Sequence, residues 1–282
     1  MIKYENCDKV SIDEVYEAFK IGFSDYMIKL EMSKEVFIKR FFGPEGNELK
    51  YSYIALDENN PVGVILGGIK NYEGVKTLRC GVLCVHPEYR GKGISQELYR
   101  LHKEVAHANH CKQMFLEVIV GNDRAIRFYT SLGYEKIYDI SYYSYEASGD
   151  ISKTVNESIK IEEITIKEIE ELDQMKDTHV NWQNDIDYIK KLEGLLHLGA
   201  YQGTNLLGGI SISNSGKIYF LWTKPCERHR GIGKSLLVKA LLELGLDKLN
   251  ISFPNNSSLA GFAKHINFKK EKIAQYEMYL TL

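Results

Sequence analysis

The stretch that decides the fold is residues 85–95, which read VHPEYRGKGIS. An apolar run over 76–86 leads into it, and apolar residues at helical spacing follow over 94–108. This order predicts a strand, a glycine turn and an amphipathic helix. The free backbone N–H groups at the start of the helix and the positive end of its dipole then meet at one place. Such a place binds anions, and Gly91 and Gly93 would let a phosphate group reach the backbone.

Two nucleotide-binding motifs are excluded by spacing. A dinucleotide fingerprint needs a third glycine at the position where this chain has Gln96. A second glycine loop over 228–235 ends like a Walker A loop, but Arg228 stands where that motif requires its first glycine. One alternative stays open for each loop, namely a glycine turn that only begins a helix and binds nothing.

The chain repeats this unit. Six residues around the first loop recur in the same order around the second: Leu83, Pro87, Arg90, Gly93, Ile94 and Leu98 match Leu221, Pro225, Arg228, Gly231, Ile232 and Leu236. Further along, Asn122, Phe128 and Tyr134 match Asn256, Phe262 and Phe268. Matches in one order predict the duplication of a single fold.

Hydrophobic periodicity predicts the elements of the first half. Ser11 and Glu14 form a capping box before a helix whose apolar positions continue to Tyr26. Strand, helix and strand in succession after Lys76 imply a parallel pair within a mixed sheet. The expected helices cover 34–42, 94–108 and 125–132, and the expected strands cover 51–57, 62–70, 76–86, 114–120 and, as one or two strands, 134–145.

The second half repeats this order from about residue 159. We expect strands over 159–164, 198–202, 206–213, 217–224, 249–253 and up to 282, and helices within 167–196, from Gly231 and near Leu259. The stretch 147–158 is polar and has no hydrophobic period, so it is expected to be a linker. The prediction is therefore an α/β (mixed α+β) protein with two tandem domains, 1–146 and 159–282.

Composition narrows the class of protein. A chain of 282 residues suits two domains, and 44% hydrophobic with 26% charged residues is typical of a folded protein. The net charge of -2 offers no basic excess for nucleic acid. The N-terminal residues are polar, and the longest apolar stretch, 62–69, is too short to span a bilayer. We expect a cytoplasmic protein without a membrane or nucleic-acid partner, as a monomer or homodimer.

Metal and disulfide sites are not expected. The five cysteines contain no Cys-x-x-Cys pair, and Cys80 and Cys84 are interpreted as small buried hydrophobic residues on one face of a strand. His102, His107 and His110 do not share one face of the expected helix, so they are predicted to be exposed rather than metal ligands.

Two motifs carry a family resemblance. Residues 85–94 resemble motif A of the GNAT N-acetyltransferases, whose core is Arg/Gln-x-x-Gly-x-Gly/Ala. Residues 122–129, which read NDRAIRFY, resemble motif B together with Gly133 and Tyr134. The resemblance covers both halves of the chain. It departs from the family at Ser95, where Gly or Ala is expected.

The resemblance implies coenzyme A as cofactor, carried by acetyl-CoA. In each unit a mixed, mostly antiparallel sheet, flanked by helices, would splay a central pair of parallel strands around coenzyme A. The pantetheine arm would pair with backbone of Leu83, Cys84 and Val85. The pyrophosphate would lie on Arg90, Gly91, Lys92, Gly93, Ile94 and Ser95. Asn122 would hold the pantetheine arm and Phe128 would pack against it.

The resemblance also implies catalytic residues. Tyr129 occupies the family position of the acid that protonates the departing sulfur, and Glu117 occupies a position often filled by a general base. An ordinary core tyrosine and an ordinary strand carboxylate are the alternatives. Asp25 and Tyr26 lie where related folds build the acceptor site, although Asp25 is equally well explained as a solvated residue at a helix end.

The second unit departs further from the family. Arg228, Gly231 and Gly233 satisfy motif A, so they form a possible second cofactor site. Its motif B has Ala263 at the tyrosine position and Asn267 at the glycine. We therefore expect catalysis in the first unit and a degenerate second unit. Catalysis in the second unit with another acid is the alternative.

The expected function is acetyl-CoA-dependent N-acetylation of a primary amine of a small molecule, by direct attack in a ternary complex. Two alternatives remain. One is a sensor that binds acyl-CoA without catalysis, and the other is an enzyme that acetylates peptide or protein amines.

Overall fold

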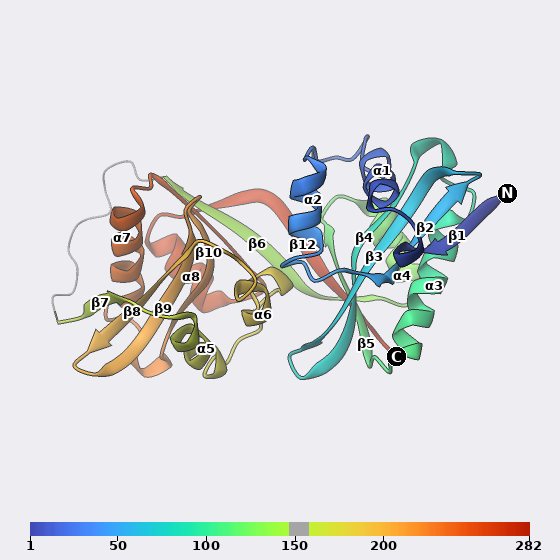
Figure 1. Ribbon diagram of the computed structural model, residues 1–282. Coiled ribbons are helices and arrows are strands. Elements are labelled where there is room, and N and C mark those ends of the chain that lie inside the picture. The colour runs from blue at the N-terminus through green and yellow to red at the C-terminus, as the bar shows by residue number, and fades with distance from the viewer. Residues whose placement is uncertain (147–157) are drawn as a thin grey trace. The chain divides into compact units, whose positions relative to one another are not determined.

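The computed structural model describes residues 1–146 and 158–282 (Figure 1). The chain forms two compact units. Unit 1 contains Met1–Tyr138 and Gln275–Leu282, and unit 2 contains Asp139–Ala274. The expected linker, 147–158, lies outside the described residues except for Ser158, which is in a turn.

Unit 1 is a mixed sheet with helices on both faces. Its strands lie in the order β1-β2-β3-β4-β5-β12. The bounds are β1 Ile2–Asn6, β2 Glu48–Asp57, β3 Asn60–Tyr72, β4 Val75–Val85, β5 Gln113–Ile119 and β12 Lys269–Thr281, with helices α1 Ile12–Gly22, α2 Lys34–Phe41, α3 Ile94–Ala108 and α4 Asp123–Ser131. The expected capping box is present, because Ser11 and Glu14 each accept a hydrogen bond from the backbone N–H of the other.

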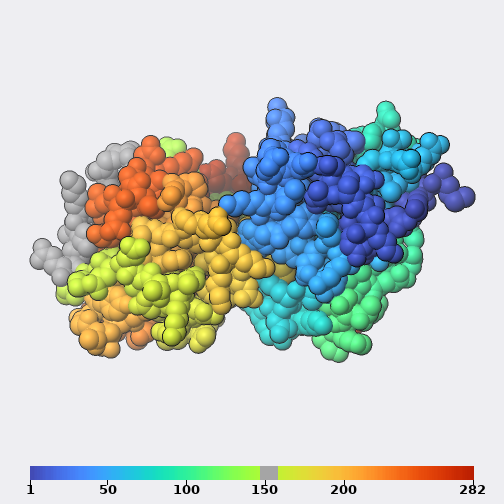
Figure 2. Space-filling model, in the orientation of Figure 1, coloured from blue at the N-terminus to red at the C-terminus, as the bar shows by residue number. Residues whose placement is uncertain are grey.

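Two hydrophobic clusters hold the layers of unit 1 together. Phe19 of α1 and Phe37 of α2 pack with Val82 and Cys84 on one face of the sheet. Figure 2 shows these two helices, in blue, on the viewed face of the unit. On the other face, residues of α3 and α4 pack with β3, β4 and β5: among them are Ile65, Leu78, Cys80, Leu98, Tyr99, Met114, Leu116 and Tyr129. Successive side chains of a strand point to opposite faces of the sheet, so one strand contributes to the clusters under both helical layers.

The parallel strands of unit 1 separate part of the way along. β4 pairs with β5 from Thr77 and Gln113 to Cys80 and Leu116, where the pairing ends. The register of β4 against β3 shifts at the same point, between Cys80 and Val82. A β-bulge of this kind bends a strand away from its neighbour. The remainder of β4 therefore keeps β3 on one side and opens a wedge toward β5 on the other.

Unit 2 repeats this plan with the strand order β6-β11-β10-β9-β8-β7. Its parallel strands pair only at Lys217 with Asn250 and at Ile218 with Ile251, and the register shifts between Ile218 and Phe220. The bounds are β6 Glu135–Glu146, β7 Lys160–Glu163, β8 Leu195–Gln202, β9 Asn205–Ser213, β10 Lys217–Thr223 and β11 Lys248–Phe253, with α5 Ile166–Gln174, α6 Ile186–Ile189, α7 Ile232–Leu244 and α8 Ser257–His265.

The boundary between the units differs from the ranges expected from chain order. Residues 141–146 at the end of β6 pair with β11 of unit 2. Residues 275–281 at the end of β12 pair with β5 of unit 1. β5 in the first half of the sequence thus pairs with β12 from the second half, and β11 in the second half pairs with β6 from the first half. The ranges 1–146 and 159–282 therefore follow the sequence repeat. The compact units divide the chain differently, because 139–146 belong to unit 2 and 275–282 belong to unit 1.

Two local expectations were wrong, and β1 was not predicted, since only Ile2 and Tyr4 alternate with polar residues there. The helices expected within 167–196 are α5 and the single turn α6. His102, expected to be exposed, is fully buried on α3, where its ring occupies the space that a Cβ atom on Gly67 of β3 would need. Cys80 and Cys84, expected on one face of a strand, pack in different clusters, because the register shift of β4 lies between them. None of the described helices is both long and apolar enough to cross a membrane. The described residues contain no group of three or more His, Cys, Asp or Glu residues that could hold a metal ion.

Candidate active site

The glycine loop of unit 1 begins α3 with a backbone suited to an anion. Gly91 and Gly93 have φ angles of 78° and 81°, and Gly93 is the N-cap residue of the helix. A Cβ atom built on either glycine would meet nothing within 4 Å, so the space outside the loop is open. Consecutive N–H groups in such a turn form a concave anion site. The loop is therefore suited to an anion such as a phosphate group.

Arg90, expected to contact the pyrophosphate, binds protein atoms through its guanidinium. Its Nε donates to the Val85 carbonyl at 3.0 Å, and one Nη donates to the Gly22 carbonyl at 3.2 Å. Both Nη atoms also bind the carboxylate of Asp25, at 2.5 and 2.6 Å. The guanidinium thus ties the loop to the end of α1, and the backbone of the loop is left to meet the phosphate.

The same ion pair changes the interpretation of the acceptor residues. The hydrogen bond from Arg90 lowers the pKa of Asp25, whose charge is balanced by the guanidinium. Asp25 is therefore paired with the loop, and its role toward an acceptor amine stays a prediction. Tyr26 follows the helix, and its hydroxyl lies 3.4 Å from Nδ2 of Asn122. This contact joins the segment after α1 to the start of α4.

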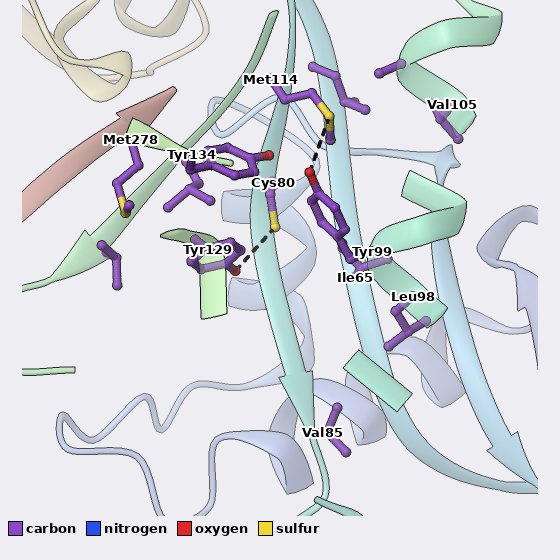
Figure 3. Close-up of a cluster of buried hydrophobic side chains, with 14 of the residues drawn as sticks. Ile65, Cys80, Val85, Leu98, Tyr99, Val105, Met114, Tyr129, Tyr134 and Met278 are labelled. Atoms are coloured by element: carbon purple, nitrogen blue, oxygen red, sulfur yellow. Dashed lines mark hydrogen bonds between the residues drawn. The ribbon is translucent and has the colours of Figure 1, made fainter. Parts of the chain in front are cut away.

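Tyr129 lies beside the point where the parallel strands separate. It projects from α4 into the core, and its hydroxyl is 3.8 Å from Sγ of Cys80, the last residue of β4 that pairs with β5 (Figure 3). Burial raises the pKa of Tyr129 well above its ordinary value, so the hydroxyl keeps its proton at neutral pH. A hydroxyl that carries its proton can donate it, although the raised pKa makes this one a weaker acid than an exposed tyrosine.

Cys80 also belongs to this site, although the sequence predicted it only as a buried core residue. It is buried, as expected, but its thiol is also the partner of the Tyr129 hydroxyl. Burial raises the pKa of Cys80 to about 11, so the thiol is not a nucleophile at neutral pH. Local pattern could not show this contact, because it joins a strand to a helix far along the chain.

Glu117 belongs to a buried ion-pair network. Arg79 donates to Glu117 Oε2 at 2.8 Å and to Glu45 Oε2 at 2.7 Å. All three side chains are nearly inaccessible, at 6%, 3% and 4% exposure for Arg79, Glu117 and Glu45. Glu117 lies on the face of β5 opposite the residues that pack with Tyr129. This network was not predicted from the sequence. The one feature that indicates it is Arg79, an arginine in the middle of the expected strand 76–86.

The remaining expected cofactor residues surround the wedge. The backbone of Leu83, Cys84 and Val85 pairs with β3 beyond the point where β5 leaves β4. Asn122 is the N-cap of α4, with its Oδ1 accepting from the Ala125 N–H at 3.2 Å. The Phe128 ring packs on Tyr129 with 5.3 Å between centroids. Two loop side chains make local contacts: Lys92 lies over the Tyr89 ring, and Ser95 bonds to Gln96.

Unit 2 reproduces the geometry of the loop. Arg228 Nε donates to the Thr223 carbonyl at 3.2 Å, and its guanidinium lies 3.6 Å from the carboxylate of Asp177. His229 and Gly231 have φ angles of 64° and 79°, in the same positive region as the φ angles of Gly91 and Gly93. A histidine in this conformation is strained, since only glycine adopts it freely. The fold keeps the loop shape even where the sequence opposes it.

A cavity of about 650 Å³ lies in unit 2. It is lined by the glycine loop, by β10 and the end of β11, by the start of α8 and by the segment between α5 and α6. Arg228, Gly231 and Gly233, the expected second cofactor residues, all line it. Cavities of this size hold small molecules and cofactors. Ala263 stands at the tyrosine position and is buried outside the lining.

Comparisons with known proteins agree with this geometry. A model of the acetyltransferase (GNAT) family matches residues 12–134. The chain is similar to N-alpha-acetyltransferase 30 of Saccharomyces cerevisiae, with 30% identity over 127 residues, 43% of this chain and 70% of that protein. A protein of the same name from Schizosaccharomyces pombe is 30% identical over 107 residues, 36% of this chain and 69% of that protein.

Solved structures resemble the whole chain. A tandem GNAT protein from the clavulanic acid biosynthesis pathway has a TM-score of 0.74 with 14% identity, over 100% of this chain and 98% of that one. A GCN5-related N-acetyltransferase from Sphaerobacter thermophilus has a TM-score of 0.69 with 12% identity, over 99% of this chain and 95% of that one. At these identities the likeness shows the fold alone.

Proposed function

The chain belongs to the GNAT acetyltransferase family, and we propose that its unit 1 transfers an acetyl group from acetyl-CoA to a primary amine. The family makes the chain an acyltransferase with acetyl-CoA as donor. The placement of catalysis in unit 1 rests on one observation, which is the position of the Tyr129 hydroxyl, 3.8 Å from Sγ of Cys80 where β4 and β5 separate. Ala263 at the corresponding position of unit 2 has no such group.

Different residues of unit 1 contribute to different steps of the reaction. Acetyl-CoA supplies a thioester, whose cleavage by an amine releases a thiolate. The loop that begins with Gly91 binds the pyrophosphate, and the free edge of β4 orients the pantetheine arm. A backbone N–H of β4 polarises the thioester carbonyl. The amine nitrogen loses one proton to water as the amide bond forms and the carbon–sulfur bond breaks, Tyr129 gives its proton to the departing sulfur and regains one from solvent, and Arg90 with Asp25 holds the loop in place.

Direct attack by the amine agrees with the state of the cysteines. Cys80 and Cys84 are the thiols nearest the wedge, and burial raises the pKa of both. Neither is a thiolate at neutral pH, so neither supports an acyl-enzyme intermediate. The proposal is therefore a ternary complex in which amine and acetyl-CoA react without a covalent enzyme intermediate.

Two classes of acceptor are compared in one experiment. Sequence reasoning favours a small primary amine, and the two N-alpha-acetyltransferase relatives favour the α-amine of a peptide. Release of coenzyme A from acetyl-CoA is measured with a panel of small amines and a panel of short peptides. Turnover with one panel identifies the acceptor class. Binding of acetyl-CoA without turnover in either panel contradicts the enzyme and supports a sensor.

Unit 2 is proposed to hold coenzyme A at Arg228, Gly231 and Gly233, which line its cavity. Calorimetric titration of the full chain with acetyl-CoA tests this through the number of sites. Charge reversal in Arg228→Glu should remove the site of unit 2. Lys264→Glu is the matched control, because it makes the same charge change at an exposed residue of α8 outside the lining. An unchanged number of sites in Arg228→Glu contradicts the assignment.

A further inference from the structure

A turn after α2 is packed against the sheet of unit 1 at two glycines. A Cβ atom on Gly68 of β3 would overlap the backbone of Gly46, and a Cβ atom on Gly81 of β4 would overlap the side chain of Asn47. Glycine at these two strand positions lets the turn approach the sheet closely. The close approach brings the buried side chain of Glu45 to β4.

Glu45 and Glu117 share the guanidinium of Arg79. One Nη atom donates to Glu45, at 2.7 Å to Oε2 and at 3.3 Å to the backbone carbonyl. The other Nη atom donates to Oε2 of Glu117 at 2.8 Å. Arg40 of α2 lies 3.6 Å from the Glu45 carboxylate, and its side chain is half exposed. Because the two carboxylates repel each other across the guanidinium, the negative charge of each is stabilised less than in an ion pair of its own.

Glu117 lies where the parallel strands separate. The pairing of β4 with β5 ends at Cys80 and Leu116, so Glu117 is the first residue of β5 beyond the paired stretch. Tyr129 contacts Cys80 at the same point, from the opposite face of the sheet. Acetyl transfer needs one group that takes a proton from the amine and another that gives a proton to the sulfur. Side chains on opposite faces of the separation suit these two tasks.

We propose that Arg79 and Glu45 are positioning residues for acetyl transfer by unit 1. As the nitrogen–carbon bond forms, the amine proton passes through water to the carboxylate of Glu117, which releases it to solvent before the next turnover. Arg79 fixes that carboxylate at the separation of the strands, and Glu45 offsets enough of the guanidinium charge for Glu117 to accept the proton. The inference rests on the proposed function of unit 1 and adds two residues to it.

Other titratable groups also face Glu117. Glu277 of β12 is directly opposite it in the register of β5 and β12 and is fully buried. The charges of both carboxylates act on Tyr72 of β3, and the hydroxyl of Tyr279 donates to Glu277 at 3.5 Å. Burial raises the pKa of both tyrosines, so they keep their protons at neutral pH. These groups are the same in every variant below, so a change in pH dependence comes from the substituted residue.

The pH dependence of kcat tests the proposal in the full-length chain. Coenzyme A release from acetyl-CoA is measured at saturation with the acceptor that reacts fastest in the two panels above, and every variant is given the same acceptor. Glu45→Gln keeps the shape of the side chain but leaves the guanidinium charge to Glu117, so the acidic limb should move to lower pH by about half a unit or more. Arg79→Gln removes the charge and should move the limb to higher pH. Glu45→Asp keeps the carboxylate and should keep the wild-type limb.

Controls separate this role from a purely structural one. Glu48→Gln makes the same change at a nearby residue that pairs with Lys50, and its acidic limb should match that of wild type. Thermal unfolding is measured for each variant, and Glu45→Gln decides the test if Arg79→Gln does not fold. An acidic limb that stays in place in Glu45→Gln, while wild type turns over, overturns the inference and leaves the proposed function intact. No turnover by wild type contradicts the proposed function and removes this inference with it.

Discussion

His102 shows how a single buried residue sets the response of unit 1 to pH. Burial lowers the pKa of His102 from 6.5 to about 3. The unfolded chain therefore binds a proton between these values that the folded unit does not bind. The stabilising contribution is complete above pH 6.5 and is lost as the pH falls toward 3, by up to about 1.4 kcal/mol per pH unit.

We expect His102→Leu to reduce this acid sensitivity. Denaturant unfolding of wild type and variant at neutral and at mildly acidic pH measures the difference in unfolding free energy. His107→Leu on the same helix is the control, because His107 is exposed. An equal loss of stability in acid for wild type and His102→Leu would show that His102 is not the group responsible.

Some residues of the site could be predicted from the sequence, whereas the contacts between them could not. The motif places Tyr129 and the glycine loop, because glycines and an aromatic residue at fixed spacing have local consequences. The pairing of Arg90 with Asp25 and the contact of Cys80 with Tyr129 join segments far apart in the chain. No local pattern encodes such partners, so the roles of Arg90 and Asp25 emerged only from the fold.

At the scale of elements, the two glycine loops form a natural pair of experiments. His229 and Gly91 occupy the same position with positive φ angles. His229→Gly should raise the unfolding free energy of unit 2 by about 1 kcal/mol, because glycine adopts this conformation without strain. Gly91→His should lower the stability of unit 1 by a similar amount. Thermal unfolding measures both changes. Equal stability of His229→Gly and wild type would contradict the strain.

Most elements were predictable because their signals are local. The capping box at Ser11 starts α1, and the glycines start α3 and α7. β1 was not predicted because its alternation is short, with only Ile2 and Tyr4 as apolar residues of an edge strand paired with β2. The helices expected within 167–196 are α5 and α6, whose bounds the apolar positions alone do not fix.

At the scale of the whole molecule, the repeat was readable but the exchange of strands was not. β6 and β12 (Figure 1) are both long strands rich in tyrosine or other apolar residues, and either pattern suits either unit. Their pairing is decided by contacts between distant parts of the chain. The consequence is that the C-terminal eight residues, 275–282, stabilise unit 1 rather than unit 2.

Deletion of 275–282 tests this consequence. The deletion removes the partner of β5 and the buried side chain of Met278 from the core of unit 1. Amide hydrogen exchange should accelerate in β5, whereas β11 should keep its protection through β6. Met278→Ala is a milder variant, expected to cost unit 1 about 2–5 kcal/mol. Faster exchange confined to β11 would refute the assignment of the strand.

The central claim is that Tyr129 acts as the acid for acetyl transfer in unit 1. The most direct test is the steady-state rate of coenzyme A release by Tyr129→Phe, with acetyl-CoA affinity measured by calorimetry. Tyr134→Phe is the matched control, because Tyr134 is a second buried tyrosine whose ring packs 5.6 Å from that of Tyr129. We expect kcat to fall about a hundredfold or more in Tyr129→Phe alone, with affinity unchanged. An unchanged kcat, or an equal fall in Tyr134→Phe, would contradict it.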